Sequence, residues 1–212
     1  MGRRLLFVLV SSAAVGGSVA FAASLSVSSA KLTVYSSCTL DSSSGGIDDA
    51  YAQQDAATLT HNTTALDVKS STTTGNQYTF LKFTNLLSSC PGLSGAQVRS
   101  ATLTLVLTTA PTRAKTYTVS RVDPAASWTQ STLTWNNKPA VVSTTTTFAA
   151  GTTTGTRTAD VTSDVTLFAA GTTNQGWRIA DLGTSTADTG VFASAENATT
   201  ANRPKLTIGY IR

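Results

Sequence analysis

The stretch ATLTLVLTT, residues 101–109, alternates apolar and polar side chains and decides the fold class of this 212-residue chain. Ala101, Leu103, Leu105 and Leu107 share one phase, and Thr fills most positions of the other. Successive side chains of a β-strand point to opposite faces, so a period of two predicts a strand with one face in a core and the other in water. A helix would repeat its apolar residues every three or four positions instead.

The same period of two recurs on both sides of this strand, in short segments separated by turn residues. About nine strands of this kind predict an all-β, antiparallel two-sheet sandwich rather than a parallel sheet. The clearest of the other segments are ALDVKS (65–70), YTFLKF (78–83), TYTVSRV (116–122), GWRIAD (176–181), GVFASAE (190–196) and KLTIGYI (205–211).

One stretch departs from this pattern. DVTSDVTLFAAG, residues 160–171, carries Val161, Val165 and Phe168 at helical spacing and predicts one short helix near 162–170. Thr162 or Ser163 is the expected N-cap, and Gly171 is expected just after the last turn.

The composition agrees with an all-β protein and excludes a nucleic-acid-binding surface. Thr, which favours strands, makes up about one residue in five, and charged residues are 12%. The formal net charge is +4, and it falls to +2 without Arg3 and Arg4. This positive charge is too weak and too scattered for a nucleic-acid partner.

The N-terminus reads as a signal peptide over residues 1–22. Arg3 and Arg4 precede an apolar stretch, and Ala20-Phe21-Ala22 supplies the small residues that a signal peptidase recognises. We expect cleavage after Ala22 and a secreted, extracellular or cell-surface protein. The competing interpretation is an uncleaved anchor, but Ser and Gly dilute the apolar stretch. No other segment is apolar enough to span a membrane, so none is expected in the membrane after cleavage.

Cys38 and Cys90 are the two cysteines of the chain. In an exported protein an even pair predicts a disulfide. This bond would tie an N-terminal segment, residues 23–45, to a sandwich domain over 46–212. A metal site on the two cysteines is less favoured, because His61 has no second nitrogen ligand near it in the sequence.

The order of several short motifs resembles the DNRLRE-type domain, a group that includes family 96 of the carbohydrate-binding modules. The motifs are DAYA (49–52), FLKF (80–83), SATLTLVL (100–107), SWTQSTLTWNNKP (127–139), DVTSDV (160–165), GWRI (176–179), FASAE (192–196) and RPKLTIGY (203–210). The resemblance covers about residues 46–212. It implies a jelly-roll β-sandwich that is exported and most often attached to, or acting beside, polysaccharide-active proteins. The chain departs from the pattern at Gln130, where the family usually has Glu, and in the turn after the first strand.

The motif SWTQSTLTWNNKP allows two interpretations of Trp128 and Trp135. In the first, both indoles hold a long connection on the edge of the sandwich. In the second, one indole lies exposed as a sugar-stacking surface, with Asn137 and Lys138 as hydrogen-bond donors. We expect at most one of the two indoles to be exposed.

Lys82 and Arg178 lie on the outward phase of their strands, and Glu196 ends another strand. A structural interpretation pairs Glu196 with one of the two cations. A functional one makes the cations ligand contacts for an acidic polysaccharide such as a uronate polymer. Jelly-roll modules often hold an ion, and Asp48, Asp49 and Asp55 could supply oxygen ligands for calcium. Their spacing matches no calcium loop, so turn capping is favoured and no cofactor or metal is expected.

Enzymatic motifs are incomplete. GLSGA, residues 92–96, fails the nucleophile-elbow pattern, DTG at 188–190 lacks the flanks of an aspartic protease, and no carboxylate pair is marked for glycoside hydrolysis. The sequence therefore predicts a secreted, monomeric, non-catalytic module that binds polysaccharide or cell-wall glycan. The alternative is a structural or adhesin domain that assembles with itself by strand addition.

Overall fold

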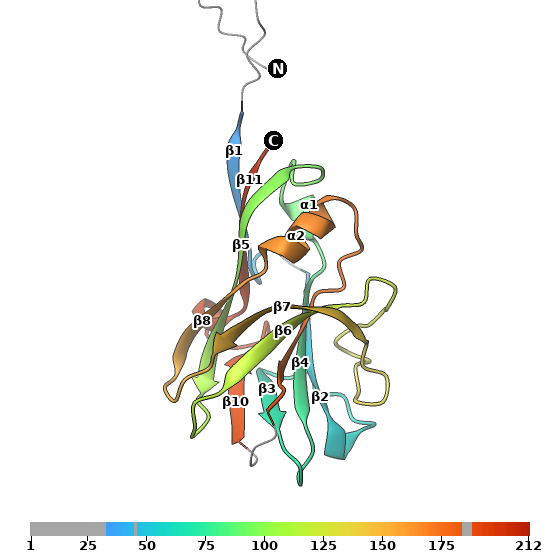
Figure 1. The fold of residues 1–212 in the computed structure, drawn as a ribbon, viewed down its shortest axis with the longest axis vertical. Coiled ribbons are helices and arrows are strands. Elements are labelled where there is room, and N and C mark those ends of the chain that lie inside the picture. Colours follow the sequence, from blue (N-terminus) through green and yellow to red (C-terminus); the bar gives the residue numbers. More distant parts are fainter. Residues whose placement is uncertain (1–32, 45, 184–187) are drawn as a thin grey trace, which may run out of the picture. The chain divides into compact units, whose positions relative to one another are not determined.

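The structure, a computed structural model, describes residues 33–44, 46–183 and 188–212. The expected signal peptide and its cleavage site after Ala22 lie outside these residues. The described part contains eleven strands with short helical turns between them (Figure 1). They are β1 (Tyr35–Leu40), β2 (Ile47–Gln53), η1 (Gln54–Ala56), β3 (Ala65–Ser70), β4 (Gln77–Phe83), α1 (Leu86–Ser89), β5 (Gln97–Thr109), β6 (Thr116–Val122), β7 (Val141–Ala149), β8 (Gly155–Asp160), α2 (Thr162–Ala169), β9 (Trp177–Asp181), β10 (Asp188–Ala193), η2 (Thr200–Asn202) and β11 (Lys205–Ile211).

The strands form one curled antiparallel sheet in the order β1-β11-β5-β10-β3-β4-β9-β6-β7, with β2 added to β4 and β8 added to β5. Between β3 and β4 the ladder consists of a single residue pair, Lys69 with Gln77. This narrow join lets the sheet fold over into two halves. The half around β5 and the half around β4, β9 and β6 then face each other, as in a sandwich.

The main core lies between the two halves, because both contribute inward side chains to one hydrophobic cluster. On β5, Leu103, Leu105 and Leu107 are at most 1% exposed, as the alternation of ATLTLVLTT predicts. The opposite half contributes Leu81, Tyr117, Val119, Trp177 and Ile179. The predicted all-β antiparallel sandwich is confirmed. None of the helices in the described part is long and apolar enough to cross a membrane.

Helix α2 covers one end of this core at the position that the sequence predicts. Gly171 follows it with φ of +106°, a left-handed value that ends the helix. The N-cap prediction is wrong: the carboxylate of Asp160 accepts the Thr162 N–H at 2.9 Å, and neither Thr162 nor Ser163 caps the helix. Inside α2, Asp164 is buried and accepts a hydrogen bond from the indole of Trp177 at 2.8 Å.

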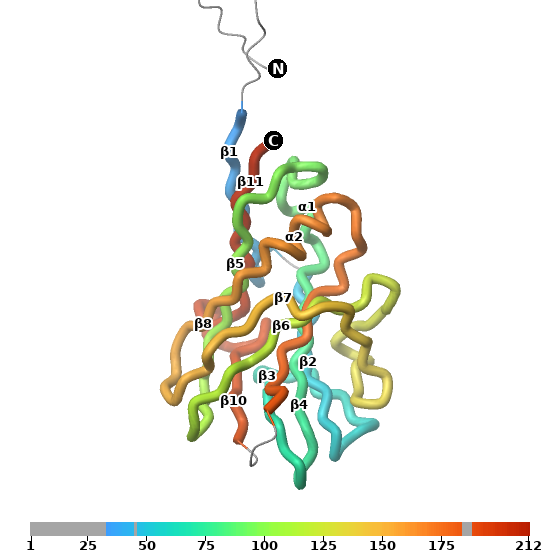
Figure 2. Tube along the Cα trace, in the orientation of Figure 1, coloured from blue at the N-terminus to red at the C-terminus, as the bar shows by residue number. Residues whose placement is uncertain are grey.

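The predicted disulfide between Cys38 and Cys90 is confirmed. Cys38 lies on β1, which also pairs with β11 over six residues from Tyr35 to Leu40. The trace in Figure 2 follows these two strands side by side. The segment that holds Cys38 is therefore tied to the domain by a sheet ladder as well as by the covalent bond.

Candidate functional site

The connection between β6 and β7, residues 123–140, lies across the outer face of β2 and β4, and we call it the clamp. Its buried side chains Trp128 and Leu133 pack with Phe80 of β4 and small residues of β2 in a second hydrophobic cluster. The Trp128 ring meets Phe80 edge-on, with 5.9 Å between the centroids. Its Nε1–H donates to the Gln175 carbonyl at 2.9 Å. These contacts make the Trp128 half of the clamp a part of the fold.

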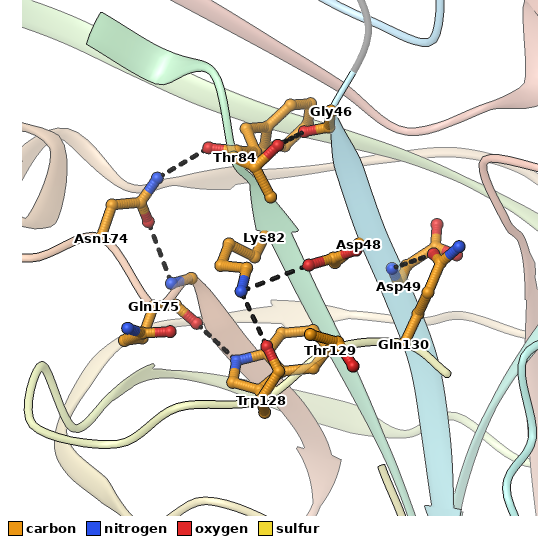
Figure 3. A network of polar contacts seen from close by, with 12 residues as sticks. Gly46, Asp48, Asp49, Lys82, Thr84, Trp128, Thr129, Gln130, Asn174 and Gln175 are labelled. Atoms are coloured by element: carbon orange, nitrogen blue, oxygen red, sulfur yellow. Dashed lines mark hydrogen bonds and ion pairs between the residues drawn. The ribbon is translucent and has the colours of Figure 1, made fainter. Parts of the chain in front are cut away.

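Lys82 anchors the clamp to β4, and Figure 3 shows its contacts with Trp128 and Asp48. Its ammonium donates to the Trp128 carbonyl at 2.9 Å, lies 3.3 Å from the Asp48 carboxylate and sits 4.8 Å from the centre of the Trp128 ring. The residue is 9% exposed. Lys82 does lie on the outward phase of β4, but the clamp covers that face. The ammonium is therefore fully engaged within the protein.

Further polar contacts fix the rest of the clamp. The Asp49 backbone N–H donates to the side-chain oxygen of Gln130 at 3.1 Å, and Asn136 N–H donates to the Ala57 carbonyl at 3.1 Å. Both polar atoms of the Asn137 side-chain amide are hydrogen-bonded within the clamp. The oxygen accepts Thr134 N–H at 2.7 Å, and the nitrogen donates to a neighbouring backbone carbonyl at 2.8 Å. Asn137 is thus the residue that shapes the turn.

The far end of the clamp forms a surface cluster with β4 and β9, which we call the aromatic–basic cluster: Tyr78, Trp135, Lys138 and Arg178. The Tyr78 and Trp135 rings lie 5.0 Å apart at 42°. The Lys138 ammonium is 3.8 Å from the centre of the Trp135 ring, and the Arg178 guanidinium is 5.0 Å from that of Tyr78. The register of β4 with β9 places Arg178 opposite Phe80 and diagonal to Tyr78, which lies two residues before Phe80 on β4. All four side chains are half-buried.

The two cations of this cluster are close enough to affect each other, and neither has an acidic partner among the described residues. Burial lowers the pKa of Lys138, and the nearby charge of Arg178 lowers it further. Burial likewise lowers the pKa of Arg178. Neither forms an ion pair with any residue that the structure describes. Among the described residues, the Arg178 Nε is buried without an acceptor, and the side-chain oxygen of Gln175 is buried without a donor. The cluster therefore offers a ligand positive charge.

This arrangement suits an anionic, partly flat ligand. Aromatic rings present apolar faces to the C–H groups of a sugar, and paired cations bind carboxylates by charge-assisted hydrogen bonds. Lys138 covers one face of Trp135 and also donates to the Trp135 carbonyl at 3.0 Å. A sugar can stack on that face only when the flexible Lys138 side chain moves aside. A carboxylate on the ligand would favour that movement.

The structure thus divides the ligand-binding candidates from the sequence between two places. It brings Trp135, Lys138 and Arg178 into one cluster and places Lys82 and Trp128 beneath the clamp. Neither indole of the pair is fully exposed: Trp128 is buried and Trp135 is half-buried. Sequence reasoning missed Tyr78. The signal was available, because Tyr78 shares the alternating phase of Phe80 and Lys82 in YTFLKF.

The structural interpretation that paired Glu196 with Lys82 or Arg178 does not agree with the structure. Within the described residues, Lys82 pairs with Asp48, and Glu196 forms no ion pair with either cation. The reason is the register: β2 lies next to β4 and brings Asp48 opposite Lys82. The turn that carries Glu196 instead meets Asp49, whose carboxylate accepts the Ala195 N–H at 2.8 Å.

The three aspartates considered for calcium are engaged separately. Asp48 pairs with Lys82 at 3.3 Å, Asp49 is fully buried and accepts the Ala195 N–H at 2.8 Å, and Asp55 lies exposed in η1. No group of three or more His, Cys, Asp or Glu residues that could hold a metal occurs in the part of the chain that the structure describes.

A comparison with curated proteins found no match. A scan against protein-family models matched the model for carbohydrate-binding module family 96 over residues 41–210. This range runs from the residue after β1 to the penultimate residue of β11 and takes in the clamp and all four residues of the aromatic–basic cluster. The chain therefore belongs to carbohydrate-binding module family 96.

Proposed function

We propose that the protein is an exported, non-catalytic, monomeric module that binds acidic polysaccharide through the aromatic–basic cluster. One observation carries the proposal: Lys138 and Arg178 lie against two aromatic rings with no carboxylate partner among the described residues. Two adjacent, half-buried cations repel each other, so an anionic ligand would relieve an unfavourable interaction within the protein. A neutral glycan would not.

The arrangement of carboxyl groups supports a non-catalytic role. Glycoside hydrolysis uses two carboxyl groups about 5–10 Å apart, so that they flank the bond to be cleaved. Among the described residues, Asp49 and Glu196 are close enough for their charges to interact, and Asp49 is fully buried. A fully buried carboxyl group is not accessible to a sugar. The aromatic–basic cluster itself contains no carboxylate.

Affinity electrophoresis and calorimetry with a panel of polymers test the proposal. We expect binding to polyuronates such as polygalacturonate and alginate, and little binding to neutral dextran. Lys138→Met and Arg178→Met should each weaken binding about tenfold or more, since each removes a charge-assisted hydrogen bond. Arg99→Met, which removes an exposed arginine of β5, is the matched control and should leave the affinity unchanged. Equal affinity for dextran and polyuronate, or full affinity in the Lys138→Met Arg178→Met double variant, would refute the proposal.

The rival function, self-assembly by strand addition, has one observation in its favour. The two end strands of the sheet, β1 and β7, contain no charged residue, and charges on edge strands normally prevent pairing with other chains. Tyr35 on β1 is 75% exposed. Sedimentation velocity of the mature protein decides between the two: a concentration-dependent polymer would favour assembly, and a monomer up to about 100 μM would favour the binding module.

A further inference from the structure

A pair of carboxyl groups lies away from the aromatic–basic cluster, where the turn after β10 meets β2. Asp49 of β2 is fully buried. Its Oδ2 accepts the Ala195 N–H at 2.8 Å, and its Oδ1 is buried without a donor in the described part of the chain. Glu196, the next residue in the turn after Ala195, is exposed and lies close enough for its negative charge to act on the Asp49 carboxyl.

The charged groups around Asp49 do not neutralise it. Asp48, its neighbour on β2, adds another negative charge. Lys82 on β4 is engaged by Asp48 and by the clamp. Arg203, after η2, directs its guanidinium to the Asn197 carbonyl and a serine hydroxyl. From the clamp, the neutral side chain of Gln130 reaches the Asp49 backbone. Two carboxyl groups can remain this close, one of them fully buried, only if something positive lies between them.

The smallest such group is a proton. When one carboxyl group is protonated, its O–H donates to the other, and the buried oxygen without a donor gains a partner. We propose that Asp49 and Glu196 share a proton, and that this proton is a latch that holds the turn of residues 194–197 against β2. The latch is independent of the proposed glycan-binding function.

The electrostatics agree with this geometry. Burial raises the pKa of Asp49 to about 8, the Glu196 charge adds to the effect, and the hydrogen bond from Ala195 N–H opposes it. Because the pKa in the folded state is above that of the unfolded chain, the stabilisation from this group is complete below about pH 4. It is lost progressively as the pH rises from about 4 to about 8. Above that range both carboxyl groups are charged, and Glu196 is repelled from β2.

NMR titration of the ligand-free protein from pH 4 to pH 10 tests the latch. We expect the Asp49 side-chain carbon to titrate with a midpoint near pH 8, and the amide signals of Ala195 and Glu196 to follow the same curve. Glu196→Gln should lower the midpoint, because it removes the neighbouring negative charge. Titration of Asp49 near pH 4, or amide signals of the turn that do not follow it, would overturn the proposal.

Unfolding equilibria provide the second measurement. The ratio of the unfolding constants of the wild-type protein and Asp49→Asn should increase with pH by up to about tenfold per unit between pH 4 and 8. Asn keeps the acceptor for Ala195 N–H, so the variant should fold. Asp123→Asn, which alters an aspartate of the clamp, is the control and should show a constant ratio. A divalent cation could replace the proton: if 5 mM CaCl2 abolishes the titration of Asp49 near pH 8, the pair is a cation site and the shared proton is refuted.

Discussion

Replacing Lys82 by Met tests how the clamp is held. Met retains most of the aliphatic stem of Lys82 but removes the ammonium that joins β4 to the Trp128 carbonyl and to Asp48. Loss of a charged donor to a buried carbonyl costs about 1.5–3 kcal/mol. The ion pair is partly exposed on the Asp48 side, at 23%, and contributes under about 1 kcal/mol. The contact with the Trp128 ring adds about 0.5–1 kcal/mol. We therefore expect the free energy of unfolding to fall by about 2–5 kcal/mol.

Urea unfolding followed by circular dichroism measures this loss, with Lys205→Met as the matched control. Lys205 is half-buried on β11 and should cost under about 0.5 kcal/mol when replaced. Affinity for a polyuronate at several NaCl concentrations separates the two roles that Lys82 could have. A lysine that touches the polymer contributes to the salt dependence of binding, whereas a lysine that only holds the clamp does not. A loss of stability below about 0.5 kcal/mol, or a flatter salt dependence in Lys82→Met, would refute the anchoring role.

Two further substitutions test the frame that carries the clamp. Replacing Cys38 and Cys90 by Ser should lower the free energy of unfolding by about 4 kcal/mol, the chain-entropy value for a separation of 52 residues. A calorimetric loss under about 1 kcal/mol would show that the pairing of β1 with β11 is enough to hold the N-terminal segment on the domain. Gly176→Ala should destabilise the protein by more than about 3 kcal/mol in urea unfolding, because Gly176 has φ of +73° and an added Cβ would lie 2.1 Å from the Leu81 carbonyl oxygen. A change in the free energy of unfolding near zero would mean that the turn before β9 can shift its backbone to accommodate the added Cβ.

Local signals in the sequence were sufficient for the scaffold. The period of two in ATLTLVLTT gives the buried face of β5 directly, since alternation depends only on strand geometry. The spacing of Val161, Val165 and Phe168 locates α2, and Gly171 marks its end. With two cysteines in the chain, a single pairing was possible, so the disulfide needed no knowledge of the fold.

The candidate site could be predicted only in part, because it depends on contacts between distant segments. Alternation correctly put Lys82 on the outer phase of β4, but it could not show that the clamp covers that phase. The partner of Lys82 is Asp48 because β2 adds to β4, and strand order is not a local property of the sequence. Arg178 meets Tyr78 through the register of β9 on β4 for the same reason.

The carboxyl pair was also beyond sequence reasoning. Asp49 and Glu196 are 147 positions apart, and DAYA and FASAE appeared as separate motifs. Their proximity depends on the turn after β10, which folds back onto β2. The hydrogen bond from Ala195 N–H to Asp49 shows this arrangement. Asp usually lies on the surface, so the burial of an Asp carboxyl group without a cation could not be predicted from the composition.

The three indole N–H groups of the chain provide the most direct test of where the ligand binds. Trp128 and Trp177 are buried, and their N–H groups are bonded to Gln175 and Asp164, whereas Trp135 lies half-buried in the aromatic–basic cluster. In a titration of the ¹⁵N-labelled protein with a uronate oligosaccharide, we expect the Trp135 indole signal and the Arg178 Nε–H signal to shift together while the other two indole signals stay in place. A bound oligosaccharide that leaves Trp135 and Arg178 unchanged, and shifts signals elsewhere, would contradict binding at this cluster.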